Sequence, residues 1–438
     1  MEIGSLSIIL IVGLLLLISI GVPMGFASGF MGAVLVFLYI GEHALGILLS
    51  RYYSLVVTYS FLSVPLFIFM ASLLERSNIA RDLYDALNAW LRKTRGGVGV
   101  VTAIMATIMA AMSGIIGGEI VLLGLIALPQ MLRLKYDQDM SIGIICASGS
   151  LGTMIPPSIV LIIYGLTTET SITMLFQEAI VPGLMISGLI ITYILIRTRL
   201  QPHLAPLSDE PPLTLKEKIS YLPGLLPPIG IVIIVLGSIY SGITGITEAA
   251  GMGVVATLII IFARKELTWF LFKDALTRTF KASGTILTIT FGATVLAGAY
   301  SLAGGPKYVA ETILAYDLKP MYLIFMMHIM FLIMGAFMDW VGIVLLAMPV
   351  FLPIVIALGF DPIWFGILFC VNMQVSFLSP PFGPAAFYLK SVAPPHISLT
   401  DIFRGFAPFI VIQLIVLACV MFFPEAMTQN FHEFKPKP

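Results

Sequence analysis

Long apolar runs alternate with short polar segments over almost the whole chain. Ten of these runs have roughly the twenty residues that an α-helix needs to cross the hydrocarbon core of a bilayer. They are residues 6–26, 28–50, 54–74, 141–165, 172–195, 222–240, 245–263, 282–303, 363–389 and 405–424. Their apolar positions lack the dyad alternation of outer-membrane barrel strands. The pattern therefore predicts an all-α polytopic membrane protein.

Two further apolar stretches, 97–132 and 321–353, are longer than one crossing and too short for two. Each is interrupted near its middle, at Gly114–Gly118 in the first and at Gly335 in the second. A helix that stops at membrane depth exposes backbone N–H and C=O groups, which only protein groups or an aqueous cavity can satisfy. We therefore expect two re-entrant helical hairpins, each entering and leaving on one side of the membrane.

Several features of the first half recur in the second, in the same order and at offsets of 220 to 224 residues. The matched pairs are Phe69 and Phe291, Glu119 and Asp339, Pro129 and Pro349, Cys146 and Cys370, and Pro156-Pro157 and Pro380-Pro381. Paired interrupted segments in two halves indicate the binding site of a secondary transporter. The match predicts two repeats and a binding site built from both.

The predicted organisation follows from these repeats. The first repeat covers 1–200, with hairpin 97–132 and a proline-broken helix at 141–165. The second repeat covers 222–425, with hairpin 321–353 and a broken helix at 363–389. Residues 201–221, with four prolines, are expected to form a cytoplasmic linker, and residues 426–438 form a C-terminal tail.

The distribution of basic residues tests this layout, because Lys and Arg gather on cytoplasmic loops. With residues 76–95 inside, eighteen of the 23 Lys and Arg residues are cytoplasmic and five are external. Each half then makes an odd number of crossings, so the second repeat is inverted and the hairpins open to opposite faces.

Residues 264–281 alternate basic and apolar positions, which favours a helix at the lipid interface over a solvated connector.

Composition agrees with a membrane protein and excludes a soluble domain. The 438 residues are 59% hydrophobic and 11% charged, with a mean hydropathy of +1.05. Cys146, Cys370 and Cys419 all lie in apolar runs and are expected to be core thiols. The sequence contains neither a Walker A motif nor an HExxH motif, so neither ATP hydrolysis nor zinc chemistry is supported.

Helix breakers and isolated carboxylates provide the candidate site chemistry. In Ser379-Pro380-Pro381, serine can cap and proline can begin a half-helix whose N-terminal dipole points to the membrane midplane. Pro156-Pro157-Ser158 is the counterpart, and a plain proline kink is the alternative. Glu119 and Asp339 are isolated carboxylates in apolar runs, and such residues are functional candidates because burying them is costly. Their alternative role is hydrogen bonding to the hairpin backbone.

Five segments together resemble the large membrane subunit of tripartite ATP-independent periplasmic (TRAP) transporters. They are SGSLGTMIPPSIVLIIYG, SITMLFQEAIVPGL, SGITGITEAAGMG, MGAFMDWVGIVLLAMPVFLPI and SFLSPPFGPAAFYLKSVAP. The resemblance implies an elevator carrier in the bacterial inner membrane that imports an organic acid on a sodium gradient. It also implies two partners, a small four-helix membrane subunit and a periplasmic binding protein. Sodium ions are the expected coupling ions, with protons as the alternative, and neither an organic cofactor nor nucleic acid is expected.

The resemblance also places the substrate and ion site around both interruptions. The first half is expected to contribute Ser113, Gly114, Gly118, Glu119, Gly149, Ser150, Gly152, Pro156, Pro157 and Ser158. The second half is expected to contribute Gly335, Asp339, Asn372, Ser379, Pro380, Pro381 and Gly383. Asp339 and Glu119 are the expected sodium ligands, and the alternative for Glu119 is that it carries a proton. The chain has Gly117-Gly118-Glu119 where many members of the family have small or hydroxylated residues.

Two other functions compete with this interpretation. The first is a stand-alone ion-coupled anion symporter of similar hairpin architecture, which would need neither partner. The second is an intramembrane enzyme that uses Glu119 and Asp339 as an acid/base pair. The sequence shows no nucleophile or metal constellation near these carboxylates, and repeat symmetry is typical of transporters.

Overall fold

The computed structural model describes residues 3–41, 44–115, 117–207, 213–315 and 318–428. Every regular element among these residues is a helix, which confirms the all-α prediction for this part of the chain. Within these described residues, seven helices are long and apolar enough to cross a membrane by length and composition. They cover residues 59–76, 172–200, 215–240, 246–263, 269–302, 340–357 and 399–422. The chain is therefore a multi-pass helical membrane protein.

The N-terminal helices differ in their boundaries from the predicted spans. They are α1 (Ile3–Ser19), α2 (Met24–Leu35) with a π-helical extension Val36–Ile40, α3 (Ala44–Val56), a 3-10 turn Tyr59–Leu62 and α4 (Ser63–Arg76). The predicted spans 6–26 and 28–50 are wrong in their ends, because Gly21 and Gly41 adopt positive φ and end the helices there. The turns at Gly21 and Gly41 lie within apolar sequence, so the hydrophobic pattern alone does not reveal them.

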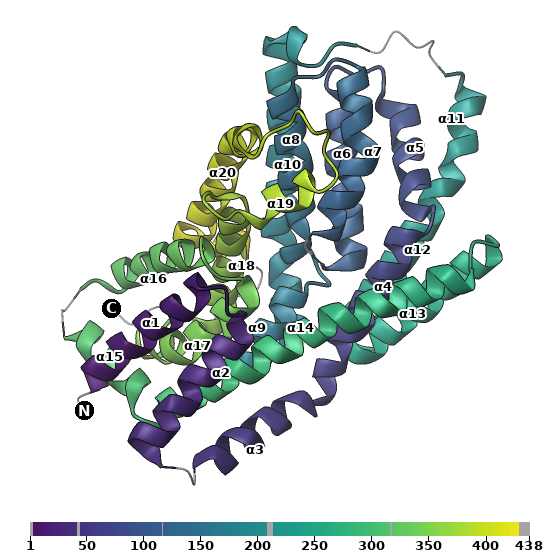
Figure 1. Ribbon diagram of the computed structural model, residues 1–438. Coiled ribbons are helices and arrows are strands. Elements are labelled where there is room, and N and C mark those ends of the chain that lie inside the picture. Colours follow the sequence, from purple (N-terminus) through teal and green to yellow (C-terminus); the bar gives the residue numbers. More distant parts are fainter. Residues whose placement is uncertain (1–2, 42–43, 116, 208–212, 316–317, 429–438) are drawn as a thin grey trace.

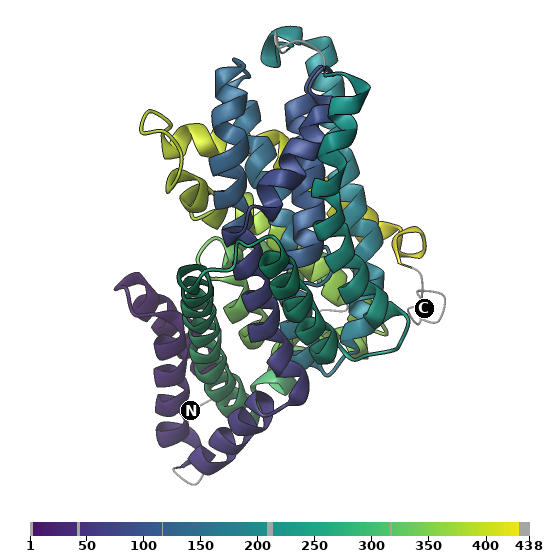
Figure 2. The ribbon, with the colours of Figure 1, turned by 90° about the vertical axis from the view of Figure 1, so that its right-hand side faces the viewer.

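Helix α14 (Trp269–Leu302) is the longest element and crosses the molecule in Figure 1. The predicted interfacial helix at 264–281 is wrong as a separate element, because residues 269–281 continue into the following span without a proline or a positive-φ residue. Helices α2 and α4 pack along it, and α13 (Ile246–Ala263) packs on α4. A Cβ atom on Gly25 or Gly32 would overlap backbone atoms of α14, so these glycines let α2 approach closely. Figure 2 shows the N-terminal helices beside α14 at one end of the molecule.

The first predicted hairpin and broken helix correspond to a compact group of helices. The group contains α5 (Ile79–Leu91), α6 (Gly97–Ser113), α7 (Gly118–Arg133), α8 (Gln138–Gly149), a 3-10 turn Ser150–Thr153, α9 (Ile159–Thr168) and α10 (Ile172–Leu200). Helices α6 and α7 lie side by side (Figure 1). The interruption between them falls within the predicted break at 114–118.

The second half begins with helices in the predicted linker. They are a 3-10 turn Pro202–Leu204 and α11 (Leu215–Tyr221), and a 3-10 turn Leu222–Leu225 and α12 (Leu226–Tyr240) follow the linker. The linker therefore contains a helix, whose start is fixed by a capping box between Thr214 and Glu217. Residues 208–212 of the linker and 429–438 of the tail lie outside the described residues.

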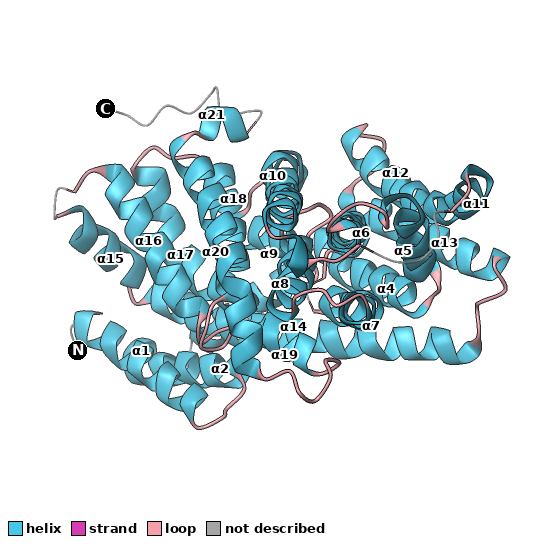
Figure 3. Ribbon diagram, turned by 90° about the horizontal axis from the view of Figure 1, so that it is seen from above, coloured by secondary structure: helices cyan, strands magenta, loops and turns pink. Residues whose placement is uncertain are grey.

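The remaining helices complete the second half. They are α15 (Gly305–Leu314), α16 (Pro320–Gly335), α17 (Trp340–Ala357), α18 (Pro362–Leu378), α19 (Pro384–Lys390), α20 (Leu399–Phe422) and α21 (Pro424–Met427). Seen from above, α8, α9, α18 and α20 occupy the middle of the molecule (Figure 3). The central helices therefore come from both halves of the sequence.

Polar and small residues join the two halves at this centre. The Tyr164 hydroxyl of α9 donates to the Pro362 carbonyl at 2.6 Å, and its ring packs against Gly366 of α18. At the ends of α8 and α20, the Arg404 guanidinium binds both carboxylate oxygens of Asp139 at 2.5 and 2.9 Å. Such bidentate pairs fix geometry as well as adding energy. The contact between the halves is therefore specific.

Candidate functional site

The first interruption folds back onto the first broken helix. We call residues 113–115 and 117–119 the first tip. Ser113 ends α6 and donates a hydrogen bond from Oγ to Glu119 Oε1 in the first turn of α7. The Gly114 carbonyl accepts from the Ile159 N–H at 3.3 Å, and a Cβ at Gly114 would overlap the Pro157 carbonyl. Gly114 is thus required for the tip to reach the start of α9.

The first broken helix brings its predicted residues to this tip. Helix α8 ends at Gly149, whose missing side chain leaves room for Ile120 of α7. Ser158 caps α9, because its Oγ accepts from the Leu161 N–H at 3.4 Å and donates to the Thr153 carbonyl at 2.6 Å. The structure therefore groups the first tip with Gly149, Ser150, Gly152, Pro156, Pro157 and Ser158, all buried.

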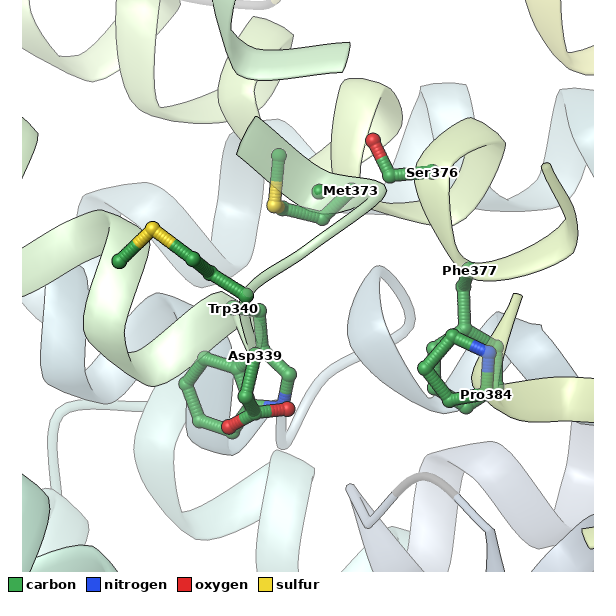
Figure 4. Close-up of a pocket in the computed structure, with 8 residues that line it drawn as sticks. Asp339, Trp340, Met373, Ser376, Phe377 and Pro384 are labelled. Carbon is green, nitrogen blue, oxygen red and sulfur yellow. The ribbon is translucent and has the colours of Figure 1, made fainter. Parts of the chain in front are cut away.

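The second interruption lies between α16 and α17. We call residues 335–340 the second tip. Asp339 caps α17 by accepting the Val341 N–H at 3.4 Å, and Gly335 leaves room for the Ser376 side chain of α18. A cavity of about 20 Å³ lies here, large enough for about one water molecule or small ion. It is lined by Gly335, Met338, Asp339, Trp340, Met373, Ser376, Phe377 and Pro384 (Figure 4).

Glu119 and Asp339 occupy different positions, although the sequence pairs them. Glu119 lies within the first turn of α7 and is 1% exposed. Asp339 is the residue before α17 and is open to the surface of the chain. In the described part of the chain, three or more His, Cys, Asp or Glu side chains never come together as a metal cluster. A cation at either carboxylate would therefore need backbone or hydroxyl oxygens as its other ligands.

The second broken helix differs from the predicted arrangement. Ser379 directly follows the last residue of α18, and its Oγ donates to the Val375 carbonyl at 2.7 Å. Pro380 and Pro381 lie in an exposed turn, and α19 begins only at Pro384, after Gly383 with a φ of 24°. The prediction that Ser379 caps a half-helix starting at Pro380 is wrong, because the next helix begins only at Pro384 and its N-cap residue is Gly383.

Asn372 connects the second broken helix to the second hairpin. Its Nδ2 donates to the His328 carbonyl of α16 at 2.8 Å. Its Oδ1 is buried and has no hydrogen-bond partner among the described residues. Asn372 lies one helical turn before Ser376, which lines the cavity at the second tip. Asn372, Gly335 and Asp339 therefore lie in one region of the structure.

Tyr388 joins the two tips. Its ring on α19 fills the space beside Gly117, where a Cβ atom would lie 2.7 Å from the nearest ring carbon. The same ring stacks on Phe377, with 6.1 Å between centroids and 23° between planes. Phe377 in turn lines the cavity at the second tip. Contacts through Tyr388 and Phe377 therefore connect the first tip to the cavity at the second tip.

Three residues of this region are absent from the site predicted from the sequence. Gln413 of α20 donates to Ser150 Oγ at 3.2 Å. In the sequence, Gln413 stands out only as the single amide side chain in the apolar run 405–424. Glu75 lies against the first tip, but it ends an apolar run beside Arg76 and so resembles the start of a loop. For Tyr388 the sequence held no signal that separates it from a packing residue.

Comparison with known proteins agrees with this architecture. Residues 11–426 match the family profile of the DctM component of tripartite ATP-independent periplasmic transporters. The C4-dicarboxylate TRAP transporter large permease protein of Pseudomonas aeruginosa is 31% identical over 370 residues, 84% of each chain. The sialic acid TRAP transporter large permease protein of Vibrio cholerae is 28% identical over 422 residues, 95% of this chain and 96% of the relative.

A solved structure shares the fold at low sequence identity. The Alcanivorax borkumensis YdaH transporter superimposes with a TM-score of 0.62 and 15% identity, over 91% of this chain and 95% of its own. The two proteins therefore share a fold. Because the family profile covers nearly the whole chain, this protein belongs to the DctM family of tripartite ATP-independent periplasmic transporters.

Proposed function

We propose that this chain is the translocation subunit of a sodium-coupled TRAP transporter that imports an organic acid anion across the bacterial inner membrane. In this proposal a periplasmic binding protein delivers the anion and a small membrane subunit completes the complex. The observation that carries the proposal is the meeting of both tips at Tyr388 in a chain of this family. A site assembled from two interrupted hairpins is the arrangement expected of a secondary transporter.

An anionic substrate is supported by the relatives and by the helix ends. The two relatives are named for C4-dicarboxylates and for sialic acid, and both substrates are carboxylic acids. Helices α7, α9 and α17 begin at or beside the tips. Helix N-termini carry partial positive charge and unpaired N–H groups, which favour carboxylates. These helix ends are the proposed binding surface for the substrate anion.

Asp339 is the proposed sodium ligand at the second tip, and Glu119 is the proposed cation-binding carboxylate at the first. The cavity beside Asp339 has the size of about one small ion, and backbone carbonyls of the interruption are hard oxygen ligands of the kind that sodium prefers. In the proposed elevator motion the tips and the broken helices move together against the layer formed by α2, α4, α13 and α14. The proposed repeats are inverted, so the tips open to opposite faces.

Reconstitution into proteoliposomes tests this function. The chain is co-purified with the small membrane subunit and supplied with the binding protein loaded with a radiolabelled organic acid. An imposed sodium gradient is expected to drive accumulation, whereas the chain alone is expected to accumulate nothing. Gradient-driven uptake by the chain alone would instead identify a stand-alone symporter.

Asp339→Asn tests the sodium ligand, because asparagine caps helices as well as aspartate does and removes only the charge. We expect sodium-driven uptake to be lost while the complex stays assembled. Asp361→Asn is the matched control, since Asp361 caps α18 by accepting the Ile363 N–H at 2.9 Å and lies away from both tips. Uptake by Asp339→Asn with an unchanged dependence on sodium concentration would rule out the ligand role.

A further inference from the structure

A groove lies on the outer surface of the chain between α1, α2 and α14. It has a volume of about 530 Å³, and its walls include the rings of Phe26, Phe30 and Phe291. Of the described residues that line it, Thr288 alone has a polar side chain, and its hydroxyl donates to the Gly284 carbonyl of its own helix at 2.8 Å. The groove therefore offers apolar contacts to a ligand and no free polar group.

The glycines beside this groove are already used for helix packing. A Cβ atom at Gly25 would lie 2.5 Å from a backbone oxygen of α14, and one at Gly29 would lie 3.4 Å from a backbone carbon. A further transmembrane helix packs best on small residues that let the two backbones approach. Here the residues that stand out from α2 are Phe26 and Phe30, which are 64% and 59% exposed. This surface favours a flexible alkyl chain, which conforms to the space between rings, over another helix.

Helix α14 continues well past the groove. Gly25 lies beside Thr288 and Gly32 lies beside Leu296, so α2 and α14 run in the same direction. Nineteen residues of α14 precede Thr288, so about five turns extend past the beginning of α2 (Figure 1). The predicted topology places the basic residues of this segment in the cytoplasm. One end of the groove therefore opens beside a segment that leads to the cytoplasmic face.

The projecting segment of α14 carries side chains that are typical of a membrane interface. Trp269, Phe270 and Phe280 are 76%, 79% and 69% exposed, and tryptophan in particular gathers at the level of lipid head groups. Lys273 and Lys281 are also exposed, and neither ammonium group has a hydrogen-bond or ion-pair partner among the described residues. Such lysines lay their alkyl stems on apolar surface and extend the charge to the lipid phosphates.

The surrounding helices leave this positive charge unbalanced. Residues 3–41, which include α1 and α2, contain no charged side chain. Asp274 is the only acidic residue of α14, and its Oδ2 already binds the guanidinium Nε atoms of Arg76 and Arg278 at 2.7 and 3.1 Å. A negative group supplied from outside the chain therefore finds no competing carboxylate at the free lysines.

Lys281 stands in line with the groove. It lies seven residues before Thr288, which corresponds to two helical turns, about 10 Å, on the same face of α14. Lys273 lies a further eight residues, about 12 Å, from Lys281 along the helix. The groove thus ends close to one unpaired ammonium group, with a second one farther away.

We propose that this groove binds an anionic phospholipid of the cytoplasmic leaflet. One acyl chain lies between the rings of Phe26, Phe30 and Phe291, and the phosphate of the head group lies against the Lys281 ammonium. Lys273 contributes at longer range. Basic sites between transmembrane helices on the cytoplasmic side are suited to anionic head groups. An apolar groove with one positive end matches an amphiphile with one negative end.

A bound lipid has a consequence for transport that rests on the proposed function. It would contact α2 and α14, two helices of the layer against which the tips are proposed to move. Because a charged head group cannot enter the hydrocarbon core without a large cost, the lipid would hold this layer at a fixed depth. The lipid site itself depends only on the position of the chain in the membrane.

Native mass spectrometry of the purified full-length chain tests the site and requires no transport. Dioleoyl phosphatidylglycerol is the anionic probe, and dioleoyl phosphatidylcholine has the same acyl chains without net negative charge. We expect tighter binding of the first phosphatidylglycerol molecule. Lys281→Gln should weaken this binding by about fivefold, the effect of one lysine near an anionic lipid surface, and Lys273→Gln should weaken it less. Lys216→Gln is the matched control, since Lys216 is exposed on α11, far from the groove (Figure 1), and it should change nothing.

A photoreactive phosphatidylglycerol with a diazirine in its acyl chain locates that chain. Crosslinks are expected on peptides that contain residues 17–30 or 288–291, and Lys281→Gln should lower their yield at limiting lipid. Equal affinity for the two lipids, equal losses in Lys281→Gln and Lys216→Gln, or crosslinks confined to other segments would overturn the site. Loss of these crosslinks in the complex with the small membrane subunit would also overturn it and assign the groove to a helix of that subunit. A chain that shows the crosslinks but fails to transport would contradict only the proposed function.

Discussion

The ring of Tyr388 lies where a side chain at Gly117 would be, so the first tip closes directly on α19. Gly117 also has a φ of 101°, a backbone conformation that a residue with a Cβ atom rarely adopts. Two independent constraints therefore require glycine at this position. Because Tyr388 also stacks on Phe377 beside the second tip, a substitution at Gly117 is expected to displace side chains at both tips.

Gly117→Ala is expected to lower uptake by about tenfold or more, since displacing a conformational equilibrium by about 1.4 kcal/mol changes it tenfold. The added methyl group collides with the Tyr388 ring and strains the backbone, at a cost of about 1–3 kcal/mol. Uptake and thermal stability of the reconstituted complex are measured together. Gly188→Ala is the control, because a Cβ there has no atom within 4 Å. If the clash with the Tyr388 ring causes the loss, the double variant Gly117→Ala/Tyr388→Ala should recover part of the uptake. Wild-type uptake by Gly117→Ala alone would contradict the close contact between Gly117 and Tyr388.

Gly366→Ala should destabilise the contact between the two halves. A Cβ at this position would lie 2.5 Å from a Tyr164 ring carbon, and the Tyr164 hydroxyl is held by the Pro362 carbonyl. Overpacking of this kind costs about 1–3 kcal/mol. The thermal unfolding midpoint in detergent is the measurement. The helical glycine Gly251 has open space around it, so Gly251→Ala should be neutral or slightly stabilising. Equal midpoints for the two variants would show that Tyr164 can move aside.

Inverted repeats predict that the outer ends of the two hairpins lie on opposite sides of the membrane. Lys135 follows α7 and Ala357 ends α17, and both residues are exposed. Single cysteines at these positions, in a background without Cys146, Cys370 and Cys419, should react with a membrane-impermeant maleimide from the cytoplasm and from the periplasm respectively. Labelling of both cysteines from one side would mean that the hairpins open to the same face.

The turn between α13 and α14 should make stability depend on pH below neutrality. Burial acts to raise the pKa of Glu266, but the Asn78 N–H and the Arg264 guanidinium, at 3.0 and 2.9 Å, lower that pKa overall. A lowered pKa contributes stability above the unfolded value of about 4.3, and this stability is lost as pH falls through the folded value. Glu266→Gln should therefore be less stable than wild type by about 1 kcal/mol at pH 7. In thermal unfolding, this difference in stability should shrink as pH falls through the lowered pKa of Glu266. A difference that stays constant as the pH is lowered would show that the lost stability comes from packing.

The sequence by itself determined the class of the protein, the position of most helices and the two interruptions. These features depend on local properties: the length of an apolar run, and glycine or proline within it. The same local reasoning failed where the backbone conformation depended on context, as at Gly21 and Gly41, and at Ser379, whose hydroxyl binds its own helix. Residues 264–281 were predicted to form a separate helix, because alternating charges do not show whether a helix continues into the next apolar run.

Only the tertiary structure decided which atoms meet at the site. Glu119 and Asp339 look equivalent in sequence, yet one is enclosed by Ser113 and Gly152 and the other caps a helix at the surface of the chain. The approach of Glu75 to Gly118, and of Tyr388 to Gly117, joins residues 43 and 271 positions apart in the printed sequence. Hydrophobic periodicity fixes which face of a helix is buried, but it carries no information about the partner that covers that face. The partner is set by how helices from both halves pack together, and the close approach is possible because glycines leave the space.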